Sequence, residues 1–218
     1  MSRSLWQALG AVVFALAVVA GAVTVTRAAS ASDVRPAPAP GRASSPGADS
    51  ADAGFARDMA AHHQQAVEMS FVVRDRTDDP DVRRLAYDIA NTQANQRGML
   101  LGWLDLWELP KIASPDAPPM GWLGGHGSHA DGAGAAEGLM PGMATRAQLK
   151  ALGEAKGRAA EVLYLRLMTA HHKGGVTMAQ GCATLCTVDA EKGLAQGMVD
   201  AQEAELKLMQ GMLREREE

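Results

Sequence analysis

The sequence predicts an all-α protein whose main domain is a four-helix bundle made of two similar helical hairpins. Three observations support this fold class. The 218 residues are 47% hydrophobic but only 4% aromatic, and are rich in alanine and methionine, a composition that favours helices over strands. Apolar residues recur at three- and four-residue spacing. Two segments that lie 109 residues apart carry the same residues in the same order.

The N-terminal 31 residues are predicted to form a signal anchor or a signal peptide. Residues 5–25 are apolar and uncharged, with Arg3 before them and Arg27 after them. A run of about 20 residues can cross a bilayer and is longer than the apolar region of about 7–15 residues in a signal peptide. The small residues at 29–31 would nevertheless suit cleavage. We therefore expect a domain outside the cytoplasm, membrane-anchored if the segment is kept and secreted or periplasmic if it is cleaved.

Residues 32–52 are rich in proline, alanine and serine and are expected to form an extended linker. The helical domain follows at residues 53–217, with helices expected at about 53–76, 80–108, 145–181 and 189–214. Residues 110–143 lack periodicity and contain prolines and glycines, so they are assigned as an irregular crossover between the hairpins. The net charge of −4 without a basic block argues against nucleic-acid binding.

Local signals support the helix ends. Asp79 before Pro80 is typical of an N-cap followed by a first-turn proline, and Thr145 with Gln148 forms a capping-box pattern. Gly153 and Gly157 are positions at which the third helix can bend or split. The pair at 174–175 is costly inside a helix, and suggests a kink or the close approach of another backbone.

The repeat is centred on a Met-x-x-His-His motif that ends at His63 in the first copy and at His172 in the second. On a helix, the motif and the methionine that follows it fall on one face. Two hairpins related by a pseudo-two-fold axis would bring both faces to one level in the bundle core. The shared register also pairs Gln93 with Gln202 and Gln96 with Glu205, which are candidates for outer partners of the histidine rings.

Histidine and methionine together suit copper better than magnesium or calcium. A di-iron site would need Glu-x-x-His pairs, but the residues three before His62 and His171 are methionines. The zinc-protease motif His-Glu-x-x-His is also absent. The alternative is that each His pair is a hydrogen-bonded part of an ordinary core. In the crossover, His126 and His129 could form a lid or an outer loading site, or be incidental.

Cys182 and Cys186 are the only cysteines. In an oxidising compartment they are expected to form a disulfide that pins the turn between the last two helices. Cys182 also continues the stripe of Met178, so a soft-metal or redox role is the second interpretation, and free thiols are the third.

Several further residues keep a fixed spacing around the two motifs: Phe55, Met69, Gln93, Gln96, Met99, Trp103 and the Met-Pro-Gly-Met element at 140–143. Together with the motifs, this pattern resembles the bacterial domain of unknown function 305 family. This resemblance over about residues 53–213 implies a ferritin-like bundle, usually exported or membrane-anchored, with some periplasmic copper-binding members. It implies these ligands: Met59, His62, His63, Met69, Met140, Met143, Met168, His171, His172 and Met178. Gln96, where the family is usually acidic, Gly174-Gly175 and the cysteine pair depart from the family pattern.

These observations predict an extracytoplasmic protein that sequesters or transfers copper and is not an enzyme. Methionines favour Cu(I), and histidines also accept Cu(II). The expected partners are the metal ion, the membrane through the N-terminal helix, and a copper-handling protein; the oligomeric state is left open. The alternatives are a metal-free structural or interaction bundle of the cell envelope and, less favoured, a copper-dependent redox enzyme.

Overall fold

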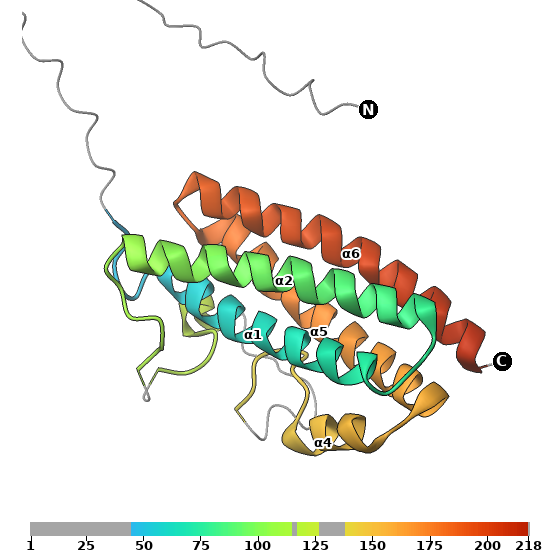
Figure 1. The fold of residues 1–218 in the computed structure, drawn as a ribbon. Coiled ribbons are helices and arrows are strands. Elements are labelled where there is room, and N and C mark those ends of the chain that lie inside the picture. The colour runs from blue at the N-terminus through green and yellow to red at the C-terminus, as the bar shows by residue number, and fades with distance from the viewer. Residues whose placement is uncertain (1–44, 115–116, 127–137, 218) are drawn as a thin grey trace, which may run out of the picture. The chain divides into compact units, whose positions relative to one another are not determined.

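A computed structural model describes residues 45–114, 117–126 and 138–217 of the chain (Figure 1). Within these ranges every regular element is a helix, which confirms the predicted all-α class. The predicted anchor at 1–31, most of the 32–52 linker and His129 lie outside the described residues. In the part that is described, no helix is both long and apolar enough to cross a membrane.

Four long helices form two hairpins. The first hairpin is α1 (Ala51–Arg74) with α2 (Pro80–Leu106), and the second is α5 (Gly157–Leu185) with α6 (Asp189–Glu217). The two hairpins join into one helical bundle mainly through α1 and α5 (Figure 1). Two short elements, η1 (Gly121–His126) and α4 (Arg146–Glu154), belong to the segment that connects the hairpins.

The predicted caps are present. The Asp79 carboxylate accepts hydrogen bonds from the amides of Asp81 and Val82, and Thr145 and Gln148 exchange both bonds of a capping box. Helix α1 begins at Ala51, inside the predicted linker, because the hydroxyl of Ser50 caps it.

The helix expected over 145–181 is divided into α4 and α5, in the stretch between Gly153 and Gly157 where the sequence allowed a bend or a split. The break lies next to Gly157, whose φ of +51° is in the region that favours glycine. The amide of Gly157 donates to the carbonyl of Arg76, at 2.7 Å, so a contact with the other hairpin holds the break. Helix α5 then continues to Leu185, beyond the predicted end at Gly181.

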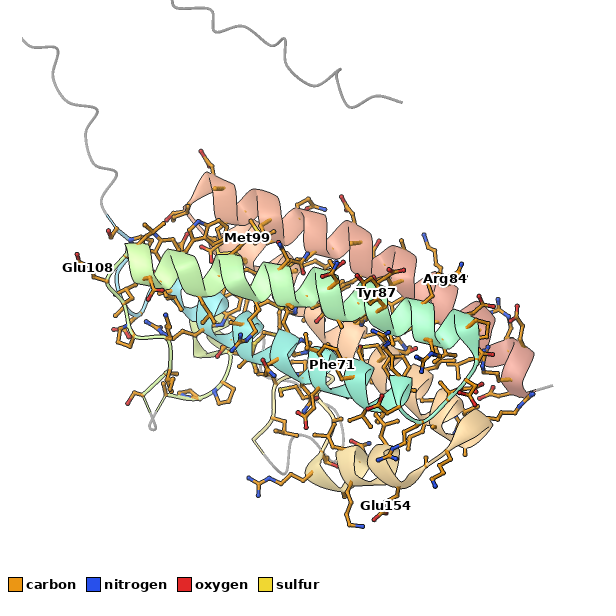
Figure 2. All side chains as sticks on the ribbon, viewed as in Figure 1. Phe71, Arg84, Tyr87, Met99, Glu108 and Glu154 are labelled. Carbon is orange, nitrogen blue, oxygen red and sulfur yellow. A yellow bond between two sulfur atoms is a disulfide. The ribbon has the colours of Figure 1, made fainter. Side chains whose placement is uncertain are left out.

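The core consists of two buried clusters with the histidines between them. Met59 and Met178 belong to the first cluster, and Met69 and Met168 to the second. Because each cluster joins the start of one motif to the end of the other, α1 and α5 must run in opposite directions. Figure 2 shows side chains between the helices, whereas the labelled Phe71, 58% exposed, lies on the outside of α1.

Two glycines allow the Met140–Met143 segment to lie directly against α5. A Cβ atom at Gly174 would lie 1.8 Å from the Pro141 carbonyl oxygen, and one at Gly142 would lie 2.1 Å from the Ala170 carbonyl oxygen. Gly142 also has a φ of +75°. Of the two explanations for the 174–175 pair, the structure therefore shows the close approach of another backbone at Gly174, whereas a Cβ atom at Gly175 would meet the side chain of Gln202.

This close approach predicts that Gly174→Ala is destabilising. The added methyl group would displace the Pro141 carbonyl, and overpacking of this kind costs about 1–3 kcal/mol. Gly197→Ala is the matched control, because Gly197 is exposed in α6 with nothing within 4 Å of an added Cβ, and it should stabilise by roughly 0.5–1 kcal/mol. Urea unfolding of both variants measures the difference, and similar free energies of unfolding would contradict the prediction.

Candidate metal centre

Four histidines are fully buried where α1 meets α5. His62 and His63 come from α1, and His171 and His172 come from α5, each with 0% exposure. The rings of His62 and His171, which occupy equivalent positions in the repeat, lie against each other with centroids 3.7 Å apart and planes tilted by 32°. The two motifs therefore meet in the core, as the repeat predicted.

Hydrogen bonds to carbonyl groups fix how two of these rings are protonated. Nε2 of His62 lies 3.1 Å from the Pro141 carbonyl oxygen, and Nε2 of His171 lies 3.0 Å from the His62 carbonyl oxygen. A carbonyl oxygen only accepts, so each Nε2 must carry the proton and donate it. The Nδ1 atoms of both rings keep a free lone pair, and neither has a hydrogen-bond partner.

The other two histidines differ from each other. Nε2 of His172 lies 2.7 Å from a carboxylate oxygen of Glu205, and its Nδ1 is unpartnered. Neither ring nitrogen of His63 makes a hydrogen bond, and the buried amide of nearby Gln93 is also unpartnered. Gln96 occupies the repeat position of Glu205, so one half of the centre has a carboxylate where the other has a neutral amide.

Burial keeps three of the rings neutral. Loss of solvation lowers the pKa of His62 from 6.5 to about 4, although its bond to Pro141 opposes the shift. The pKa of His63 falls to about 3, first through burial and then through the proximity of His62. Burial and the neighbouring imidazoles hold the pKa of His171 well below its usual value. Neutral imidazole is the form that binds metal ions.

The structure separates the predicted methionine ligands into two groups. Met59, Met140 and Met178 belong to the first core cluster, and Met143 packs against it. Met69 and Met168 lie in the second cluster, on the other side of the histidines. The crossover thus adds two thioethers to one side of the centre only.

Sequence reasoning missed the residue that fastens the crossover to α1. The buried side chain of Gln65 donates to the Ala144 carbonyl at 3.0 Å and accepts from the Ala144 amide at 2.6 Å. These paired bonds hold the chain next to the Pro141 carbonyl that His62 contacts. The available signal was a polar residue on an otherwise apolar helix face, but its partner is 79 residues away.

The donor set fits a soft or borderline metal ion. The Nδ1 atoms of all four histidines are buried without partners, and thioethers flank them on both sides. The histidines alone do not form a ready site, however. Among the residues that the structure describes, the one group of three histidine, cysteine or carboxylate donors within 4.8 Å is Cys182, Cys186 and Glu191. A metal ion at the histidines would therefore need methionine sulfurs or small ring movements to complete its coordination.

The remaining predicted positions lie elsewhere. Cys182 and Cys186 are joined by a disulfide at the end of α5. The backbone of His126 belongs to η1, but its side chain, like the whole of His129, lies outside the described residues. The predicted role of these two histidines stays a prediction.

Solved structures with the same fold support a family relationship. A DUF305 protein from Streptomyces coelicolor, described as secreted, is 63% identical, with a TM-score of 0.70 over 78% of this chain and 96% of that one. A DUF305 fragment from Deinococcus radiodurans is 28% identical, with a TM-score of 0.61 over 76% and 96% of the two chains. CopM in its Cu(I)-bound form is 22% identical, with a TM-score of 0.57 over 75% and 96%, a likeness in fold alone.

No significant match was found among functionally curated proteins. The family model described as "Domain of unknown function (DUF305)" matches residues 52–213, which include all four long helices except the ends of α1 and α6. This range contains both Met-x-x-His-His motifs and the crossover between them. The chain therefore belongs to the DUF305 family.

Proposed function

We propose that this protein binds copper outside the cytoplasm, through its two Met-x-x-His-His motifs, and sequesters it or passes it on. The observation that carries the proposal is the layer of four buried histidines whose Nδ1 atoms all lack a partner. A buried polar atom without a hydrogen bond costs about 1–3 kcal/mol. Several such atoms in one layer, on rings held neutral by burial, are best explained as ligand atoms.

Copper is the metal that this donor set favours. Imidazole suits copper in both oxidation states, and thioether favours Cu(I). CopM, which has the same fold, has been crystallised in Cu(I)-bound, Cu(II)-bound and silver-bound forms. We propose Cu(I) as the preferred ion at the side with Met59, Met140 and Met178, and Cu(II) as an ion that the histidines also accept.

The position of the centre suits storage or transfer. Met143 is the partly exposed member of the proposed ligand set, whereas the histidines are buried. Copper would enter or leave past the Met140–Met143 segment, and exchange with a copper-handling partner would occur there. We propose a binding protein and assign no reaction to it.

Two observations support a location outside the cytoplasm. The S. coelicolor protein is described as secreted, and residues 5–25 of this chain have the composition of a signal or anchor segment. We propose that the domain is exported, and that the bundle is ferritin-like and arose from two equivalent hairpins.

The pKa shifts predict that the metal-free protein loses stability in mild acid. The unfolded chain takes up protons near the ordinary pKa of 6.5, but folded His62 and His63 do so only near 4 and 3. The contribution of the neutral rings to the free energy of unfolding is therefore complete above pH 6.5. It decreases as the pH falls toward the folded-state pKa values, because the unfolded chain binds more protons than the folded one. Each ring should account for a loss of about 1 kcal/mol between pH 6.5 and about 5.5. Urea unfolding of chelator-treated protein measures this slope.

A His63→Gln variant tests the assignment. Glutamine removes the titrating ring of His63 but keeps a polar group beside Gln93 and Gln96. The number of protons taken up on unfolding in mild acid, which sets the slope of stability against pH, should therefore decrease by about one. Equal slopes for the variant and the wild type would show that His63 does not cause the acid sensitivity.

The motif histidines are expected to carry Cu(II) binding. Changing His62, His63, His171 and His172 together to alanine should weaken Cu(II) binding at least about 100-fold, which equals about 2.7 kcal/mol, as measured by competition with a chelator. Met209→Leu/Met212→Leu, in α6 and outside both motifs, is the control that should bind normally. A histidine variant that keeps its helical circular dichroism and its copper stoichiometry would remove the motifs from the proposal.

The methionine thioethers are expected to cause the preference of the site for Cu(I) over Cu(II). Leucine substitutions at Met59, Met140, Met143 and Met178 preserve volume and cost little stability, but they remove the thioethers on one side of the centre. Cu(I) affinity should fall about 100-fold, with Cu(II) affinity changing less than tenfold. An equal loss for both ions would point to a packing effect instead of thioether ligation.

A further inference from the structure

A second group of ligand-type side chains lies at the turn between α5 and α6, away from the histidines in sequence. Cys182 and Cys186 are 0% and 3% exposed, and Glu191, in the first turn of α6, is 0% exposed. The two sulfurs and a Glu191 carboxylate oxygen all lie within 4.8 Å of one another. Apolar residues of the first core cluster, including Ala195 and Met198, pack with both cysteines.

Glu191 is a buried acid at this turn, close to the cysteines and to Asp52. Neither of its oxygens has a hydrogen-bond partner, and burial, together with the nearby Asp52, raises its pKa to about 9. The Asp52 carboxylate accepts hydrogen bonds from the amides of Thr187 and Val188 and from the Thr187 hydroxyl, and a protonated Glu191 beside it can donate to its remaining acceptor site. Glu191 is therefore a neutral, buried acid that lies beside both Asp52 and the cysteine pair.

We propose that the reduced protein binds a thiophilic divalent ion of the zinc class at Cys182, Cys186 and Glu191. Two thiolates and a carboxylate are ligands that zinc uses in proteins. Cys182 and Cys186 lie four residues apart at the end of α5, with Cys186 as its C-cap, and Glu191 lies in the first turn of α6. A metal ion would take its third ligand from a Glu191 oxygen, which lies within 4.8 Å of both sulfurs, and a water or a neighbouring group would occupy the fourth position.

The oxidation state of the cysteines decides whether the site exists. In the structure the two sulfurs form a disulfide and cannot bind as thiolates. A dithiol reductant would transfer two electrons by thiol–disulfide exchange, becoming a disulfide itself while Cys182 and Cys186 become thiols. Binding of the ion then releases three protons, one from each thiol and one from the Glu191 carboxyl group. No motif histidine takes part.

Cobalt(II) is the probe that tests the proposal, because thiolate ligation gives it a charge-transfer absorption. The full-length protein is reduced with a dithiol, freed of reductant without oxygen and titrated with Co(II). One equivalent should give the absorption, and Zn(II) should remove it. The oxidised protein should give none. The variant without the four motif histidines should keep the absorption, which separates this site from the proposed copper site.

Glu191→Gln is the decisive variant, since the amide closely matches the protonated acid in size and should leave the melting temperature of the oxidised protein unchanged. Even outer partners of metal ligands are worth about 10–100-fold in affinity, so loss of this ligand should weaken Co(II) binding at least about tenfold. Glu203→Gln, at an exposed position of α6, should bind like the wild type.

Three results would overturn the proposal. The first is a folded, reduced protein without the thiolate absorption. The second is equal Co(II) affinity for the Glu191→Gln and Glu203→Gln variants, which would mean that the thiols bind without the carboxylate. The third is a reduced protein that loses its helical circular dichroism and does not regain it with Zn(II).

Discussion

The contact between His62 and His171 is the interaction on which the rest of the structure depends. Rings 3.7 Å apart require α1 and α5 to lie close together, and the antiparallel crossing places one methionine from each motif on either side. The same contact joins the two hairpins, because α1 and α5 supply most of the interface between them. The stability of the fold and the placement of the candidate ligands therefore rest on the same few residues, so substitutions in the motifs are expected to affect both.

The crossover makes the two halves of the centre unequal. His171 donates to a carbonyl of α1, whereas His62 donates to Pro141 of the crossover. Gln65 holds that segment in place, and Gly142 and Gly174 give it room. A segment that looks irregular in sequence thus sets the tautomer of a central imidazole and brings two methionines to one side of the histidine layer.

The sequence predicted local features well, because their causes are local. The caps at Asp79 and Thr145 depend on residues within one turn, and helical periodicity identified the buried faces. The exact repeat also indicated that the two motifs face each other. The hydrogen bonds of Gln65 could not be predicted, because their partner lies 79 residues away. The sequence allowed a split at Gly157, but not the contact with Arg76 that holds it. Glu191 is close in sequence to both cysteines, but an acid in the first turn of a helix is ordinary, so its burial beside them gave no signal. Metal binding by the motif residues stays a prediction.

Glu205 in one half of the repeat and Gln96 in the other differ in charge, and this difference affects how well the histidine layer can balance a bound cation. The rings of His62, His63 and His171 are neutral, so a cation held by them enters a poorly solvated layer with little compensating charge. Glu205, with 24% of its side chain exposed, is the carboxylate in contact with the layer. One negative charge balances the whole charge of a monovalent ion but only half of the charge of a divalent ion. For copper bound as proposed, this imbalance stabilises Cu(I) relative to Cu(II) and raises the reduction potential of the bound ion.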